Sequence, residues 1–375
     1  MTLLTLLTLV GTFLWIIILL LPWRPGSTRE FLDGEPDDCH EDLSNITVLI
    51  PARNEAAVIR DTLSGILAQG RHIKVILVDD QSEDKTASLA GKMRLNNLKI
   101  VSGRPLPDGW SGKLWALHQG FQRVDTPLVL LLDADIELKP GILSKLLREM
   151  GTRKVHLISL MAYLRMISPW ERLLMPAFIY FFKLLYPFHL SNSRFRGVAA
   201  AAGGCILIRT DMLKAIGGFS AVRGELIDDC ALARKVKAIG GRTWIGLSHS
   251  ALSLRAYDQP GVIWNMVART AFHQLHDSIS LLLLVTGTML LMFLMPMIGL
   301  FFPSLTAGIS SLCGLSAMIL GYTPTLKFYG LNWKWAFFMP LIGLLFLSMT
   351  WTSAIRFWQG KGAEWKGRAY GEKRG

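Results

Sequence analysis

Uncharged apolar runs at both ends of the chain constrain its fold more than any other feature. The first, Thr2–Leu21, contains no charged residue and is followed by Arg24 and Arg29. Three more lie near the other end: Ser278–Phe302, Ser304–Tyr322 and Ala336–Ile355. Each is long enough to be considered as a membrane-spanning helix. Because most charged residues lie between these ends, we expect a soluble domain flanked by membrane segments.

The first apolar run has the character of an anchor and not of a cleaved signal peptide. No basic region precedes it, and no small-residue cleavage site follows it. We therefore predict five regions. They are a transmembrane anchor (1–23), a linker (24–44), a soluble domain (45–277), C-terminal membrane segments (278–355) and a basic tail (356–375).

The net charge of +12 in a chain that is 51% hydrophobic points to a membrane and not to nucleic acid. Much of the positive excess lies beside the apolar runs, and the tail holds six basic and two acidic residues among Trp358, Trp365 and Tyr370. Such tails are typical of cytoplasmic contact with anionic headgroups. No nucleic-acid motif accompanies the charge. The four cysteines are widely spaced, so we expect buried thiols and no disulfide framework.

The region between the apolar ends alternates strands with helices. Continuous apolar strands are expected at Ile46–Ile50, Val75–Val78, Leu98–Val101 and Leu128–Leu132. Between the first two, Glu55–Gln69 places apolar residues on one helix face and is followed by Gly70. This pattern predicts an α/β fold with a mostly parallel sheet covered on both faces. Ligands of such sheets bind beyond the carboxyl ends of the strands.

Acidic side chains follow the strand that ends at Leu132. Asp133 and Asp135 are two residues apart, and strand alternation would place both carboxylates on one side. Paired carboxylates suit Mg²⁺ or Mn²⁺, because such hard cations take their remaining ligands from water and substrate phosphates. The alternative is that Asp135 only caps the following turn.

Two further polar clusters have both a binding and a structural interpretation. Asp79 and Asp80 begin an acidic stretch that could hold a base or ribose, or could serve as a helix N-cap cluster. Lys113 ends Gly109–Lys113, which lacks the spacing of a phosphate loop. It could meet one phosphate as a single charge or be a surface lysine.

Asp228 and Asp229 open an expected helix over Cys230–Ile239. A carboxylate at a helix N-terminus is stabilised as the anion. A general base must be deprotonated to accept a proton from a hydroxyl group, so this position suits a base. Simple capping is the alternative, although the preceding Gly224 and Glu225 favour a site.

The segment 168–190 is apolar and aromatic but is interrupted by charged residues and prolines, among them Glu171, Lys183 and Pro176. If it crossed a membrane, it would separate the carboxylates at 133 and 135 from those at 228 and 229. We therefore predict that it is an amphipathic segment lying on the membrane surface.

Taken together, these motifs resemble family 2 glycosyltransferases with a GT-A fold. The resemblance rests on Val48–Glu55, Val78–Asp84, Leu132–Asp135 and the glycine pairs at 203–204 and 217–218, all in the family's order. Asp228-Asp229 stands where the family carries its Glu-Asp catalytic pair. The resemblance covers roughly residues 45 to 250.

The family resemblance implies roles for individual residues. It implies nucleotide contacts at Pro51, Arg53, Glu55 and Asp80, and we add Asp79 and Lys113 to this donor set. It implies metal and diphosphate binding at Asp133 and Asp135, with Asp229 as the base and Asp228 beside it. The implied reaction is inverting transfer from a nucleotide-diphosphate sugar.

A narrower resemblance concerns the acceptor. Trp110–Ala116, Met266–Phe272 and the membrane tail resemble a hopanoid-biosynthesis-associated subgroup, which implies a lipid acceptor. A polyprenyl phosphate, a glycerolipid or a sphingolipid remain alternatives. The Gln-x-x-Arg-Trp motif of processive members is missing, and Arg269–Phe272 stands near its place. We therefore expect transfer of a single sugar.

Nucleotide sugars are cytoplasmic, so we predict a multi-pass protein of the bacterial inner membrane with its soluble domain in the cytoplasm. Three full crossings after that domain would place the basic tail outside, against the positive-inside rule. We therefore predict that Ser304–Tyr322, which is rich in glycine and serine and lies between Pro303 and Pro324, is a partial or re-entrant segment. A membrane transport protein is the rival class. It would need ionisable residues within its spans, and the four apolar runs contain none.

Overall fold

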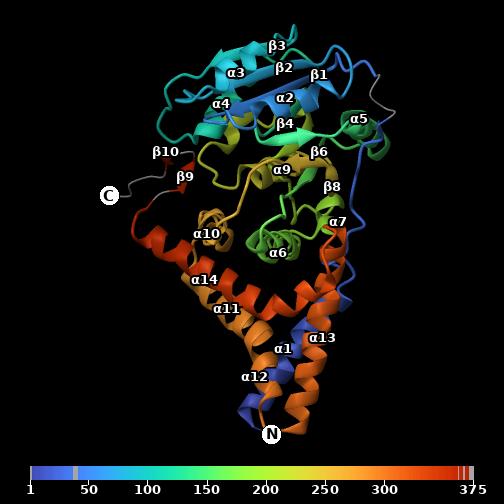
Figure 1. The fold of residues 1–375 in the computed structure, drawn as a ribbon, viewed down its shortest axis with the longest axis vertical. Helices are drawn as coiled ribbons and strands as arrows, with labels where there is room; N and C mark the ends of the chain where they lie inside the picture. Colours follow the sequence, from blue (N-terminus) through green and yellow to red (C-terminus); the bar gives the residue numbers. More distant parts are fainter. Residues whose placement is uncertain (1, 37–40, 362, 366–367, 371–375) are drawn as a thin grey trace.

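The computed structural model describes residues 2–36, 41–361, 363–365 and 368–370. An α/β domain lies above a set of long apolar helices, and both the N-terminus and the α12–α13 connection lie at the far end of these helices (Figure 1). Much of the basic tail predicted for 356–375 falls outside the described residues.

The domain is built on an eight-stranded sheet in the order β3-β2-β1-β4-β7-β6-β8-β5. The strands are β1 (Ile46–Ala52), β2 (Lys74–Asp79), β3 (Leu98–Ser102), β4 (Leu128–Leu132), β5 (Ile136–Leu138), β6 (Leu157–Tyr163), β7 (Cys205–Arg209) and β8 (Thr243–Ser253). Strands β3, β2, β1 and β4 are mutually parallel, as are β6 and β8. Strand β7 is antiparallel to both of its neighbours, and β5 is antiparallel to β8. The predicted α/β fold with a mostly parallel sheet is confirmed.

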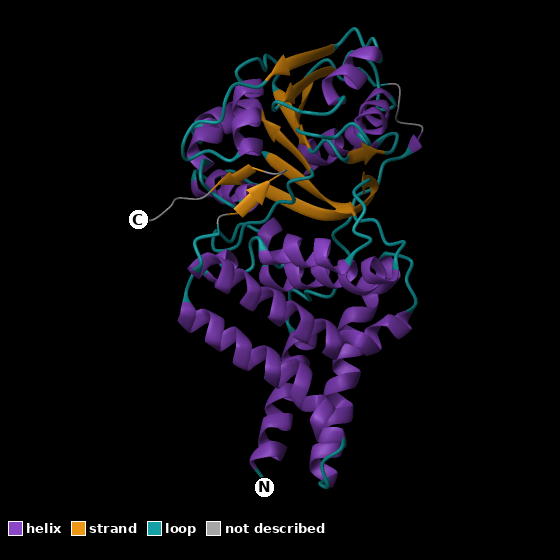
Figure 2. Ribbon diagram, turned by 60° about the vertical axis from the view of Figure 1, so that its left-hand side comes forward, coloured by secondary structure: helices purple, strands orange, loops and turns teal. Residues whose placement is uncertain are grey.

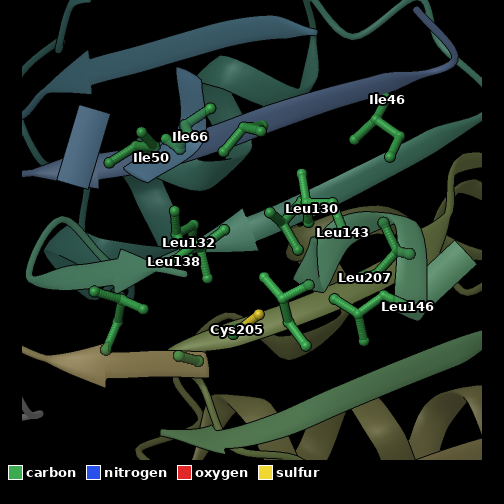
Figure 3. Packing of buried hydrophobic residues seen from close by; sticks show 14 of the residues in the cluster. Ile46, Ile50, Ile66, Leu130, Leu132, Leu138, Leu143, Leu146, Cys205 and Leu207 are labelled. Carbon is green, nitrogen blue, oxygen red and sulfur yellow. The ribbon is translucent and has the colours of Figure 1, made fainter. Parts of the chain in front are cut away.

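Helices cover both faces of this sheet, because successive strand residues point to opposite sides. Leu130 and Leu132 pack with α2 (Ile59–Leu67) and α5 (Ile142–Arg153) in one core, part of which is drawn in Figure 3. Their neighbours Val129 and Leu131 pack on the other face with α4 (Gly112–Phe121) and α9 (Asp228–Ala238). Helices α3 (Thr86–Lys92) and α8 (Thr210–Ala215) complete the two layers.

Two boundaries differ from the sequence-based expectation. Strand β1 continues through Pro51, which lies beside Val78 of β2, so the turn comes after Ala52 and not at the proline. Helix α2 begins at Ile59 and not at Glu55. The intervening loop is held instead by the β2–α3 loop: the Asn54 amide donates to Ser82 Oγ at 3.0 Å, and the Glu55 amide donates to Thr86 Oγ1 at 2.8 Å.

Helix α6 (Pro169–Leu185) lies between the domain and the long apolar helices, and the short α7 (Phe188–Asn192) follows it (Figure 2). Ser168 and Glu171 form a capping box at the start of α6. Glu171 is fully buried and also accepts the Tyr257 amide at 2.8 Å, which ties α6 to the segment after β8. Tyr180 of α6 packs against Trp15 and Tyr322 of the apolar helices. The location of α6 on a membrane surface stays a prediction.

Four helical stretches are long and apolar enough to cross a membrane. They are α1 (Leu3–Leu20), the continuous run α11–η4–α12 (Ile279–Met289, Leu290–Leu294, Met295–Leu300), α13 (Leu305–Phe328) and η5–α14 (Trp333–Phe338, Met339–Trp358). Their existence agrees with the predicted membrane segments.

Helices α1, α12 and α13 pack closely through small residues. A Cβ atom on Gly11 would lie 2.0 Å from the Leu291 carbonyl oxygen, so only glycine permits this approach. Hydrogen bonds add to the contact: Thr12 Oγ1 donates to the Ser310 carbonyl, and Trp15 Nε1 donates to the Met292 carbonyl, both at 2.8 Å.

The break expected of a re-entrant segment at Ser304–Tyr322 is absent from this helix, and a partial crossing stays a prediction. Helix α13 is unbroken from Leu305 to Phe328 and passes through Pro324 without ending. The small residues that suggested a break instead serve helix packing, since Ser310, Ser311 and Gly314 are buried against α1 and α12.

Helix α14 follows a different course from its three neighbours. In Figure 1 it runs across the top of the other apolar helices, beneath the domain. Near its start, Met339 packs in one cluster with Leu173 of α6. Near its end, Ser353 Oγ accepts the Phe272 amide at 3.0 Å, and Arg356 donates to Asn265 at 2.7 Å. Both ends of α14 therefore contact segments that adjoin the domain.

The cysteine prediction holds in part. Cys205 and Cys230 are buried free thiols, whereas Cys313 is exposed on the surface of α13. Cys39 lies outside the described residues.

Replacement of Glu171 should reveal how much the docking of α6 contributes to stability. In Glu171→Ala, the Ile167, Ser168 and Tyr257 amides lose their common acceptor inside the protein, so we expect a loss of about 3 kcal/mol. The measurement is the thermal unfolding temperature of the purified protein in detergent. Asp125→Ala is the control, because Asp125 pairs with Lys74 on the exposed surface and should contribute little to stability. Equal shifts for the two variants would contradict this role of Glu171.

Candidate active site

The carboxyl ends of β1 and β4 meet the N-terminal ends of α4 and α9 around one small cavity. Its polar lining consists of Lys113, Asp133, Asp228 and Asp229, and its wall includes Pro51 and Gly203. Residues from widely separated parts of the chain thus converge at the sheet edge that the sequence predicted. Asp79 and Asp80 lie at the end of the adjacent strand β2.

Asp133 and Asp135 lie in a turn and not on a strand. Strand β4 ends at Leu132, and the Ile136 amide donates back to the Asp133 carbonyl at 3.1 Å. The alternation argument therefore does not describe their geometry. The alternative that Asp135 merely caps a turn does not hold either, because its carboxylate pairs with Arg255 at 2.8 Å.

Lys113 is a half-buried site residue and not a surface lysine. Ser111 caps α4 and begins the helical turn that carries Lys113, whose Nζ lies 2.6 Å from Asp133 Oδ1. Burial alone would lower the pKa of Lys113, but the charges of Asp133 and Asp228 overcome this effect and raise it. Lys113 therefore stays cationic among carboxylates.

Arg255 belongs to the site, although the sequence analysis did not select it. It follows the end of β8 and places its guanidinium between two predicted site residues, with Nε 2.8 Å from Asp135 and one NH2 3.4 Å from Glu55. No local motif surrounds it. Only the pairing of β8 with β6 and β5, which is a tertiary feature, brings it to this edge.

Arg53 has a structural role in this arrangement. Its side chain is 6% exposed, and its NH1 donates to the carbonyls of Asp80 and Gln81, both at 2.8 Å. Its NH2 also pairs with Glu83 at 3.0 Å. Arg53 thereby joins the loop after β1 to the loop after β2, so any effect on a nucleotide would act through the shape of these loops.

The N-cap interpretation of this acidic stretch holds at Asp84 and not at Asp79 or Asp80. Helix α3 begins at Thr86, and the Thr86 amide donates to Asp84 and to neither of these residues. Asp79 Oδ1 is a buried acceptor for which the described residues supply no hydrogen bond. A buried acceptor without a partner is costly, so this atom suits a donor group of a ligand.

Asp229 is held firmly at the start of α9. Its Oδ2 accepts the Gly203 amide at 2.8 Å, and its Oδ1 accepts the Cys230 amide at 2.7 Å. Burial and the neighbouring Asp228 raise the pKa of Asp229 to about 6, against the opposing effect of Lys113. The described part of the chain offers the Asp228 side chain no ion pair or hydrogen bond.

The site borders the helices beneath the domain. Tyr186, at the end of α6, donates its hydroxyl to Gln274 of the short helix η3 (His273–Leu275) at 2.6 Å. Burial raises the pKa of Tyr186, and the charge of Asp229 contributes, which places this tyrosine close to α9. Tyr186, which ends α6, therefore lies near Asp229 and is tied to η3.

Asp133 and Asp135 fit a divalent cation in the manner of a nucleotide site. Burial raises the pKa of Asp133 despite Lys113, and the nearby charge of Asp135 adds to the effect. A cation placed between such carboxylates would relieve their repulsion. Within the described ranges no group of three or more histidine, cysteine or acidic side chains could hold a metal alone. Phosphate and water oxygens would have to complete the shell, as Mg²⁺ sites commonly allow.

Comparison with known proteins agrees with this geometry. Residues 47–217 match Glycosyl transferase family 2. Over 135 residues the chain is 27% identical to a 4,4'-diaponeurosporenoate glycosyltransferase of Staphylococcus haemolyticus, and 36% of each chain is covered. Over 126 residues it is 36% identical to a poly-beta-1,6-N-acetyl-D-glucosamine synthase of Staphylococcus aureus, covering 30% of this chain and 29% of the relative. The matches thus span about a third of these relatives.

A solved structure resembles almost the whole chain. It is a mannosyltransferase from Pyrobaculum calidifontis in complex with GDP-Man and Mn²⁺, with a TM-score of 0.59 and 17% identity. The similarity covers 96% of this chain and 100% of the mannosyltransferase, and at this identity it supports the fold alone. Residues 47–217 therefore resemble a family 2 glycosyl transferase domain, and the chain has the α/β GT-A fold.

Proposed function

We propose that this protein is an inverting, non-processive glycosyltransferase that moves one sugar from a nucleoside-diphosphate sugar to a lipid acceptor. The observation that carries the proposal is the convergence of Lys113, Asp133 and Asp229 on one cavity within a family 2 domain. Hexosyl and N-acetylhexosaminyl donors both fit this proposal.

Each group has a distinct task in this reaction. Asp229, oriented by two backbone amides, accepts the proton of the acceptor hydroxyl as the oxygen attacks the anomeric carbon. Lys113 and Arg255 supply positive charge near the diphosphate, and Asp79 Oδ1 offers an acceptor to the nucleoside. Asp133 and Asp135 would hold Mg²⁺ or Mn²⁺, which neutralises charge on the departing nucleoside diphosphate.

A lipid acceptor is supported by what lies beside the base. Tyr186, which follows the last residue of α6, lies near Asp229 and donates a hydrogen bond to Gln274 of η3. An amphiphilic acceptor could remain in the bilayer while its hydroxyl reaches Asp229 from this side. A hopanoid is one candidate, as the narrower sequence resemblance implies, and a polyprenyl phosphate, a glycerolipid or a sphingolipid are the others.

We also infer a membrane topology with three crossings, made by α1, the α11–α12 run and α13. The connection of α12 to α13, residues 301–304, carries no charge, whereas Arg24, Lys327 and Arg356 lie at the domain end of these helices. The positive-inside rule then supports a cytoplasmic domain and tail in the bacterial inner membrane. Helix α14 lies in the interface, because both of its ends contact segments beside the domain.

The proposed reaction can be tested with membranes that contain the protein and a panel of radiolabelled nucleotide sugars. We expect label to enter the lipid extract as a single-sugar product and to disappear in excess chelator. Transfer that persists in chelator would contradict the metal requirement. Label found only in a polymer would contradict single-sugar transfer.

Asp229 should determine the acid side of the pH profile. Because its pKa is raised to about 6 and only the deprotonated form accepts a proton, kcat/KM should fall about tenfold per pH unit below about pH 6. Asp229→Asn should keep nucleotide binding and lose transfer. Asp228→Asn is the matched comparison. If only Asp228→Asn loses transfer, together with the fall of kcat/KM at low pH, Asp228 is the base.

Two introduced cysteines distinguish the possible topologies in a variant that lacks the natural ones. Lys334→Cys precedes α14 and Gln359→Cys follows it, and both positions are exposed. With α14 in the interface, an impermeant reagent on intact cells should label neither, whereas Pro303→Cys should react. Labelling of Gln359→Cys alone would mean that α14 crosses the membrane. Labelling of Lys334→Cys alone would restore a partial crossing by α13.

A further inference from the structure

The two cationic side chains of the site are paired with the carboxylates that would bind a metal ion. Lys113 Nζ lies 2.6 Å from Asp133, and Arg255 Nε lies 2.8 Å from Asp135. A second branch of Arg255 lies 3.4 Å from Glu55. The acceptor side chains of Asp135 and Glu55 are each only 12% exposed. These are partly buried pairs, in which removal of one partner leaves the other charge poorly solvated.

We propose that Lys113 and Arg255 are exchangeable counter-ions, which make binding of the divalent cation depend on the nucleotide diphosphate. A metal that arrives alone must compete with both cations for Asp133 and Asp135, and would leave the two cations unpaired. A diphosphate that arrives alone meets a site rich in carboxylates, with Asp228 and Asp229 nearby. Each ligand by itself therefore breaks favourable pairs.

When both ligands bind together, every charge keeps a partner. The metal takes the place of the two cations at Asp133 and Asp135, and Lys113 and Arg255 pair with the phosphates. The coupling between two ligands is reciprocal, so the nucleotide should raise metal affinity by the same factor as the metal raises nucleotide affinity. The inference rests on the proposed donor class, because it assigns the diphosphate as the new partner of these two residues.

The placement of Lys113 and Arg255 explains how each can exchange its carboxylate partner for a phosphate. Lys113 is 20% exposed and Arg255 is 38% exposed, so both side chains reach solvent, whereas Asp133 and Asp135 are fixed in a turn. Lys113 lies on α4 and Arg255 follows β8, so the two cations reach this turn from different elements. A diphosphate beside this turn would be within reach of both long side chains.

The test measures Mn²⁺ binding to the purified full-length protein, with and without UDP or GDP as probes. The electron paramagnetic resonance signal of free Mn²⁺ reports how much of the metal is bound. In the wild type, one nucleotide should tighten Mn²⁺ binding. Lys113→Met and Arg255→Met should each tighten Mn²⁺ binding without nucleotide by about tenfold, because a competing cation is gone. The tightening caused by the nucleotide should shrink by a similar factor in both variants.

Matched controls separate this effect from a general change of charge. Lys74→Met and Arg209→Met remove cations from exposed pairs with Asp125 and Asp211 and should leave Mn²⁺ binding unchanged. Arg255→Lys should retain most of the coupling. The double variant with Arg255→Met and Asp135→Asn should lose the tighter Mn²⁺ binding of Arg255→Met. This result would place the bound Mn²⁺ at the turn that contains Asp135.

Unchanged or weaker Mn²⁺ binding in both Lys113→Met and Arg255→Met, with normal unfolding temperatures, would overturn the proposal. If neither UDP nor GDP affects the wild type, the proposed donor class fails for these nucleotides. The comparison without nucleotide still decides the counter-ion role, because it needs only the metal. If one variant does not fold, the other decides alone, since each removes one cation.

Discussion

The ion pair between Lys113 and Asp133 is the contact on which the rest of the site depends. It joins the first turn of α4 to the turn that ends β4, and the Gly203–Asp229 hydrogen bond lies beside it. A Cβ atom on Gly203 would lie 3.1 Å from Lys113 Nζ, so the chain before β7 approaches this pair as closely as glycine allows. Through these contacts α4, β4, β7 and α9 share one electrostatic centre.

Such a concentration of charge requires a rigid frame. Burial raises the pKa of Asp133 and of Asp229, and neighbouring carboxylates add to the effect. The sheet supplies the frame because its strands are buried on both faces and cannot shift apart without exposing two hydrophobic layers. Arg53, buried under the loops after β1 and β2, adds a second fixed point at the same edge.

The parts of the site that were predictable are those encoded in local patterns. Apolar strands followed by acidic residues predicted the sheet edge at which Asp79, Asp80 and Asp133 lie, because parallel strands end together. The family resemblance, and not the strand pattern, placed Asp229 at the same site. Arg255 was not predictable in this way, since its nearest motif is the plain end of β8 and its partners lie far away in sequence. The structural role of Arg53 was hidden for the same reason, because its acceptors are backbone carbonyls that carry no sequence signal.

Prediction of the membrane segments from the sequence is limited for the same reason, because tertiary contacts decide their arrangement. Length and hydropathy select four helices equally, and they do not separate a helix that crosses from one that lies across its neighbours. Glycine and serine in α13 resembled a break, but the same small residues let α1 and α12 pack against it. In α14 the deciding contacts are tertiary: Met339 with α6 at one end, and Ser353 with the Phe272 amide at the other. With both ends beside the domain, α14 fits the proposed topology, in which it lies in the interface. In that proposed topology the number of crossings after the domain is even, so the basic tail and the domain share one side, in agreement with the charge rule.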